Sequence, residues 1–97
     1  MPTYLVFGNW TDEGIRNAKE APARGRRAIQ LAEQQGCKAV GVLVLMGEHD
    51  VALRVEAPDD AAIARYVLSL ASWGTIRTKT VKAFTLEEFE QVVQALP

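Results

Sequence analysis

Cysteine and histidine are almost absent from this chain of 97 residues, which contains one of each, Cys37 and His49. A single thiol cannot form an internal disulfide, and no Cys or His pair lies nearby to build a structural zinc site. Glycine-rich phosphate loops and Cys-x-x-Cys are missing as well, so the common signatures of cofactor binding are not present. We therefore expect no structural metal site and no cofactor, and a structural role for Cys37 as a small residue at the entry to a strand.

Long hydrophobic runs and a strong charge excess are also missing. The apolar runs are shorter than a membrane span, and Met1-Pro2-Thr3 lacks the basic and apolar regions of a signal peptide. The formal net charge is −1, which gives no general attraction to nucleic acid or acidic lipid. Arg24, Arg26 and Arg27 form a compact basic patch, which we interpret as a solvated helix face. We predict a cytoplasmic protein that binds neither nucleic acid nor membranes.

The chain does contain enough apolar sequence for one compact domain, residues 1–97. Hydrophobic residues make up 48% and charged residues 24% of it, as in ordinary folded domains, and no linker-like stretch divides it. A domain of this size buries a limited fraction of its surface. An excess of apolar surface would therefore favour association with another chain.

Apolar periodicity predicts four strands and four helices along the sequence. The strands are expected at 3–10, 38–46, 51–57 and 75–84, and the helices after Thr11, from about 23 to 35, between Pro58 and Gly74, and from the capping box Thr85-Leu86-Glu87-Glu88 onward. We expect the last helix to bury its apolar stripe, which consists of Phe89, Val92, Val93 and Leu96.

The order of these elements is that of a ferredoxin-like βαββαβ domain with an added C-terminal helix, an α+β fold. Right-handed crossovers place the two central helices on one side of a four-stranded antiparallel sheet. The strand at 38–46 is apolar on both faces, because Val40, Val42, Val44 and Met46 alternate with Ala39, Gly41, Leu43 and Leu45. Since no helix is available for the second side, we expect a second copy to cover it, giving a homodimer.

The segment Gly47-Glu48-His49-Asp50 joins two apolar runs and predicts a tight hairpin turn with a positive φ at Gly47. It contains the only histidine, between two carboxylates. His49 is a candidate catalytic base, a candidate metal ligand, or a surface side chain. Because neighbours in a strand point to opposite faces, we expect His49 and Asp50 not to touch each other.

Polar residues on neighbouring strands supply further candidates. Asp50, Arg54 and Glu56 share one strand face, and Thr78, Thr80 and Lys82 are in phase on the last strand. If both sets reach the same side, they could hold a small polar ligand between two sheets, the alternative being salt bridges across a dimer. Trp10 is either a core anchor or a residue that stacks on a ligand. The candidate ligand-binding set is Trp10, Gly47, His49, Asp50 and Arg54.

Four segments carry a resemblance to a known family. They are Gly-Asn-Trp-Thr-Asp-Glu-Gly-Ile at 8–15, Met-Gly-Glu-His-Asp at 46–50, Glu-Ala-Pro-Asp-Asp at 56–60 and Ala-Phe-Thr at 83–85. Through them the chain resembles the GYD-domain family of small bacterial and archaeal proteins, which is similar to the dimeric α/β-barrel superfamily. That family is named for a Gly-x-Tyr-Asp-like turn, and here His49 stands where tyrosine is usual. The resemblance implies a ferredoxin-like domain that dimerises as an α/β barrel.

Two hypotheses for function follow. The first is a small cytoplasmic homo-oligomeric module that binds an unidentified small molecule or serves as an assembly unit. The alternative is a cofactor-independent enzyme, suggested by the antibiotic-biosynthesis monooxygenases of the resembled superfamily, with His49 as base and a small aromatic substrate. A closed cavity lined by His49 and a tryptophan would favour the enzyme, and a filled core with an exposed His49 would favour the module.

Overall fold

The computed structural model describes residues 1–97, and its elements follow the predicted order. The strands are β1 (Thr3–Trp10), β2 (Lys38–Val44), β3 (Val51–Glu56) and β4 (Ile76–Ala83). The helices are α1 (Asp12–Arg16), the 3₁₀ helix η1 (Ala18–Glu20), α2 (Ala21–Gln34), α3 (Asp60–Ala71) and α4 (Leu86–Gln94). None of these helices is long and apolar enough to cross a membrane.

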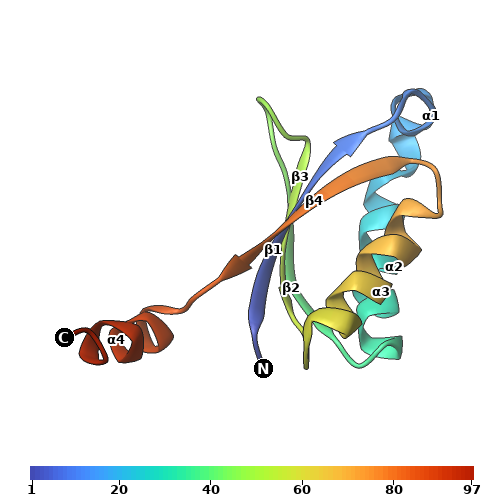
Figure 1. Cartoon of the computed structure of the whole chain (residues 1–97). Coiled ribbons are helices and arrows are strands. Elements are labelled where there is room, and N and C mark those ends of the chain that lie inside the picture. The colour runs from blue at the N-terminus through green and yellow to red at the C-terminus, as the bar shows by residue number, and fades with distance from the viewer.

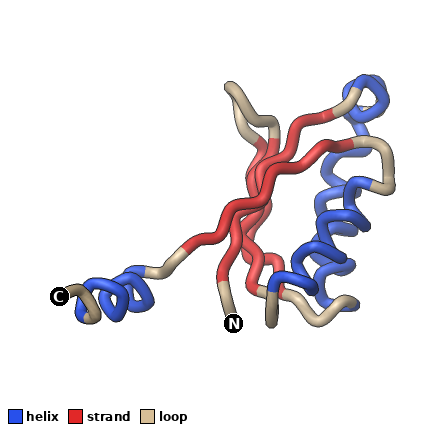
Figure 2. Tube along the Cα trace, in the orientation of Figure 1, coloured by secondary structure: helices blue, strands red, loops and turns tan.

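The four strands form one antiparallel sheet in the order β2-β3-β1-β4, with α2 and α3 packed together on one face. The tube in Figure 2 shows this two-layer arrangement, in which no helix lies flat against the other face. We call that other side of the sheet the open face. The predicted α+β, ferredoxin-like topology is thus confirmed.

The core lies between the sheet and the two helices. It is a cluster of 13 buried residues, in which Tyr66, Val6 and Val55 are the largest fully buried side chains. The Tyr66 hydroxyl donates a hydrogen bond to the Ala28 carbonyl oxygen at 2.6 Å. That bond joins α3 to α2 and satisfies a polar group that would be costly to bury alone.

A bulge in β2 overturns the strict alternation expected for this strand. Gly41 has a φ of +77°, and the register with β3 shifts between Val40 and Val42. The extra residue moves the side chains beyond it to the opposite faces. As a result Val42 packs against the core, while Val40 and Leu43 both point to the open face, where Val40 pairs with Arg54 and Leu43 with Ala52.

The open face carries an apolar centre. Directly paired residues share a face of a sheet, and the register places these side chains there: Leu5, Phe7, Val40, Leu43, Ala52 and Val81. Leu43 is 65% exposed and Val81 46% exposed. The charged residues on this face are four basic ones and one acidic one, Lys38, Arg54, Arg77, Lys79 and Glu56. The open face is therefore apolar in the middle and mainly basic around it.

The terminal helix begins as predicted but is not buried as predicted. The capping box is formed, because Glu88 N donates to Thr85 Oγ1 at 3.1 Å and Thr85 N donates to Glu88 Oε1 at 2.9 Å. These bonds favour the carboxylate and lower the pKa of Glu88. However, β4 carries the chain away from the sheet, so α4 projects beyond it on the side of the open face (Figure 1). Its apolar residues stay 46% to 88% exposed: Leu86, Phe89, Val92, Val93 and Leu96.

One arginine of the predicted solvated basic patch is buried instead. Arg24 is 8% exposed and donates from Nη1 to Asn17 O at 2.9 Å and from Nη2 to Gly14 O at 3.2 Å. A cation at the C-terminal end of α1 is favoured by the carbonyl groups exposed there. Arg27 lies over the Trp73 ring at 5.3 Å from its centroid, so only Arg26 keeps the predicted environment.

Two glycines allow a matched test of this packing. A Cβ at Gly14 would lie 2.2 Å from the Thr75 carbonyl oxygen, whereas a Cβ at Gly25, inside α2, would meet only Val42 Cγ1 at 3.9 Å. We predict that Gly14→Ala lowers the free energy of unfolding by about 1–3 kcal/mol. Gly25→Ala should raise it by about 0.5–1 kcal/mol, because alanine is the better helix former. Urea titrations measure both, and equal effects would contradict the close approach at Gly14.

Candidate functional site

The turn between β2 and β3 is longer than the predicted four-residue hairpin. Because β2 ends at Val44, the connection runs from Leu45 to Asp50. It is closed by a hydrogen bond from Leu45 N to Asp50 O at 2.7 Å. Gly47 has a φ of +139°, which confirms the positive φ expected at this glycine.

His49 packs against β1 on the open face. Its ring stacks on Phe7, with a distance of 4.9 Å between the ring centroids and an interplanar angle of 28°. His49 Nδ1 lies 3.0 Å from Asn9 Oδ1, and Asn9 Nδ2 donates to Glu48 O at 2.8 Å. Since the second bond fixes the amide of Asn9 with Oδ1 as acceptor, His49 Nδ1 is the donor in the first.

Asn9 was missed when site residues were chosen from the sequence. Its side chain holds the backbone of the turn and the His49 ring at once. The only sequence signal was its position at the end of the first strand, in the Gly8–Ile15 segment. An asparagine at a strand end is common in loops, so composition alone does not mark it as the clamp of a distant turn.

Asp50 has a structural role that is separate from His49. Its Oδ2 accepts a hydrogen bond from Trp10 N at 2.9 Å, and its own backbone N donates to Gly8 O at 2.9 Å. The turn is therefore attached to the end of β1 at two neighbouring points. Asp50 and His49 bond to different groups, as the alternation of side chains predicted, so the pair does not form a carboxylate-held base.

The two polar strand sets do not meet. Arg54 pairs with Leu5 and Val40 and lies on the open face. Thr78, Thr80 and Lys82 pair with Gly8, Val6 and Tyr4, and so lie on the helix-covered face. Lys82 Nζ instead lies over the rings of Tyr4 and Phe84, at 5.2 and 5.3 Å from their centroids. The expected polar pocket built from both sets is therefore not formed.

The candidate ligand-binding set is divided in the same way. Trp10 lines a cavity of about 70 Å³ between the sheet and the helices, together with Trp73 and Arg24. His49, stacked on Phe7, lies on the other side of the sheet with Arg54. The sheet itself thus separates the cavity from the histidine. No group of three acidic, Cys or His side chains that could hold a metal ion is found at either place.

The only thiol is poorly placed for chemistry. Cys37 is buried at the entry to β2, and burial raises the pKa of its thiol above the ordinary value. The thiol therefore stays protonated at neutral pH, which agrees with the structural role expected from the sequence.

Comparison with known proteins identifies the family. The GYD domain matches residues 4–93, nearly the whole chain, and the chain belongs to the GYD domain family. A protein of Thermus thermophilus is 34% identical over 89 residues, which are 91% of this chain and 94% of the relative. That relative is a glutamine synthetase and cystathionine beta-lyase binding protein.

A solved structure supports the fold. The crystal structure of MtbAldR superposes with a TM-score of 0.60 at 16% sequence identity. The match covers 87% of this chain and 52% of MtbAldR, so this chain corresponds to about half of that protein. At this level of identity the likeness concerns the fold alone.

The clamp between Asn9 and His49 can be tested with a double-mutant cycle. We predict that Asn9→Ala and His49→Ala each destabilise the protein, and that the double variant loses less than the sum, with a coupling of about 0.5–1.5 kcal/mol. Chemical denaturation of the four proteins gives the coupling energy. Strictly additive effects would mean that the two side chains do not interact in solution.

Proposed function

We propose that this protein is a homodimeric protein-binding module, in which the open faces of two copies close on each other. The observation that carries the proposal is the uncovered apolar centre of the sheet, including Leu43 at 65% exposure. An apolar patch of this kind on a small domain favours burial against another protein surface. A second copy is the partner that a two-fold symmetric dimer requires, because the same patch is then used twice.

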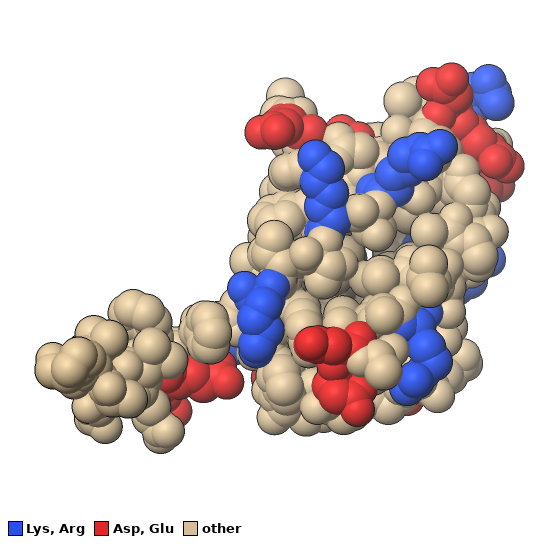
Figure 3. Space-filling model, in the orientation of Figure 1, with Lys and Arg blue, Asp and Glu red and all other residues tan.

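The position of α4 supports the same dimer. The helix projects on the side where the second sheet would lie (Figure 1), so it can reach around the partner copy. Its charged residues are Glu87, Glu88 and Glu90, with no basic residue, whereas the open face has four basic side chains. Figure 3 shows acidic atoms at the base of α4 and basic side chains along β4. The charges of the arm and of the partner surface are thus complementary.

The binding targets of the dimer are proposed to be enzymes. The Thermus thermophilus relative is named for binding glutamine synthetase and cystathionine beta-lyase, and the two proteins match over almost their full lengths. We propose cytoplasmic enzymes of these two classes as the first partners to test. Because the proposed dimer covers the open face and α4, the helix-covered side of the domain is the contact surface left for these enzymes.

The geometry gives less support to the monooxygenase alternative. An enzyme of that type would need His49 in the apolar cavity that receives the substrate. His49 lies instead on the open face, stacked on Phe7, and it is not among the residues that line the cavity. We therefore favour the binding module.

A charge on the open face tests the dimer. Leu43→Asp should give a folded monomer, because an unpaired carboxylate buried between two sheets costs several kcal/mol, whereas in the single chain this position is exposed. Leu68→Asp is the matched control, since Leu68 is 70% exposed but lies on α3, and it should leave the dimer intact. Light scattering measures both masses. A wild-type monomer, or a Leu43→Asp dimer, would contradict the proposal.

Binding to enzymes can be measured directly with purified proteins. Glutamine synthetase and cystathionine beta-lyase from the source organism should each be immobilised and titrated with the wild-type chain. We predict saturable binding of at least one, with a Kd of about 10 μM or tighter, and competition when both enzymes are present. No binding of either enzyme at about 100 μM would contradict the partner assignment while leaving the dimer untouched.

A further inference from the structure

The cavity on the helix-covered side of the sheet has no role in the proposed dimer. It lies where the start of α2 faces the ends of β1 and α3, and 10 of its 13 lining residues are hydrophobic. Its volume is about 70 Å³, roughly half that of the ~150 Å³ cavity that accommodates benzene in an engineered protein. A cavity of this size has room for a small organic molecule of a few heavy atoms.

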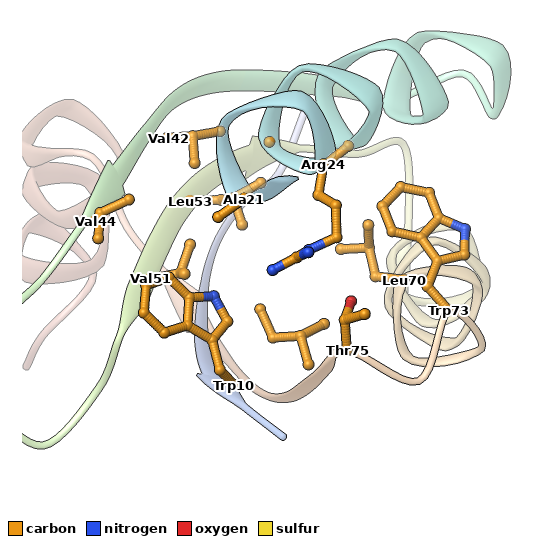
Figure 4. Close-up of a pocket in the computed structure, with 13 residues that line it drawn as sticks. Trp10, Ala21, Arg24, Val42, Val44, Val51, Leu53, Leu70, Trp73 and Thr75 are labelled. Atoms are coloured by element: carbon orange, nitrogen blue, oxygen red, sulfur yellow. The ribbon is translucent and has the colours of Figure 1, made fainter. Parts of the chain in front are cut away.

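A buried cation points into this cavity. Arg24 is 8% exposed, and Figure 4 shows its guanidinium in the space between Trp10 and Thr75. Both of its hydrogen bonds go to main-chain carbonyl oxygens, those of Asn17 and Gly14. No carboxylate is among its partners, so the positive charge is buried without a counter-ion. Burial of an unneutralised charge is unfavourable, and an anion in the cavity would relieve it.

The two hydrogen bonds from Arg24 to the end of α1 leave part of its hydrogen-bonding capacity unused. A guanidinium has five N–H groups in a planar fork, and the carbonyls at the end of α1 use two of them. Three N–H groups remain, and a guanidinium is the side-chain group that binds a carboxylate most specifically. Arg24 can therefore hold α1 in place and bind a ligand at the same time.

Two further side-chain donors belong to residues that line the same cavity, Trp10 and Thr75. In Figure 4 the Thr75 hydroxyl and the Trp10 indole nitrogen both lie toward the interior of the cavity. The hydrogen bonds of these residues to the rest of the chain involve the backbone, namely Trp10 N to Asp50 Oδ2 and Thr11 N to Thr75 O. Their side-chain donors are thus available to an acceptor. Much of the remaining lining is aliphatic and includes Val42, Leu53 and Leu70.

We propose that this cavity binds a short-chain organic carboxylate of roughly two to four carbon atoms, with the carboxylate on Arg24 and the alkyl part against the aliphatic wall. The apolar lining favours this ligand over an inorganic anion. Both lose hydration on entering the cavity, but only the organic carboxylate has an alkyl part that gains apolar contacts there. The inference goes beyond the proposed dimer and does not depend on it, because the cavity lies on the other side of the sheet.

The two tryptophans of the chain make the test direct. Trp10 and Trp73 are the only ones, and both line the cavity, so intrinsic fluorescence reports on its occupancy. Acetate, propionate and butyrate should be titrated at constant ionic strength against chloride, nitrate and propionamide. We expect a saturable change with the carboxylates, propionate being at least about tenfold tighter than nitrate, and none with the neutral amide. No saturable carboxylate response up to about 20 mM, or an equal response to nitrate, would overturn the proposal.

Variants identify the residues that hold the ligand. Arg24→Lys keeps the charge but loses the planar fork, so propionate binding should weaken at least about tenfold. Arg26→Lys, an exposed neighbour on the same helix, should bind as the wild type does. Thr75→Val removes the hydroxyl without touching the carbonyls that Arg24 holds, and should weaken binding about threefold. Thr75→Val decides the question if Arg24→Lys does not fold. Wild-type affinity in Thr75→Val and in a folded Arg24→Lys would contradict the assigned site.

Discussion

A sheet with helices on one side only has a second side that faces water or another protein, and this constraint governs the whole molecule. In this chain the second side has an apolar centre to which β1, β2, β3 and β4 all contribute. The helices α2 and α3 already use the first side, where Tyr66, Val6 and Val55 are fully buried. Association with another protein surface would bury this apolar centre, and the exposed apolar side of the projecting α4 as well.

The turn and the bulge determine which side chains reach the open face. Gly41, with a φ of +77°, changes the phase of β2, so that Leu43 rather than Val42 faces outward. At the far end of the sheet, Asn9 and Asp50 attach the turn to β1, and the His49 ring then covers Phe7. The only histidine thus belongs to the surface where the second copy is proposed to sit, and its contacts are with Phe7 and Asn9 rather than with the neighbouring carboxylates.

The sequence predicted the topology, the capping box at Thr85 and the positive φ at Gly47, because each depends on local propensity or on strong periodicity. It did not predict the bulge at Gly41: an isolated glycine inside a strand can indicate a bulge, but the apolar alternation continues on both sides of Gly41 and favours an unbroken strand. The burial predicted for Phe89 and its neighbours is not found within the chain. A hydrophobic stripe on a helix indicates that the stripe can be covered, but it does not show whether the cover comes from the same chain. Arg24 was placed in solvent for a similar reason, as its partners are main-chain carbonyls that no sequence motif marks.

If a second copy covers both the open face and α4, the α4 amides are protected from hydrogen exchange in the dimer. A helix of nine residues is only marginally stable alone in water. We expect the amides of Phe89 to Gln94 to exchange at least about tenfold more slowly at high protein concentration than after dilution below the dimer dissociation constant. Exchange of these amides at the same fast rate in the concentrated dimer would show that α4 is not held by the partner, and would contradict the account.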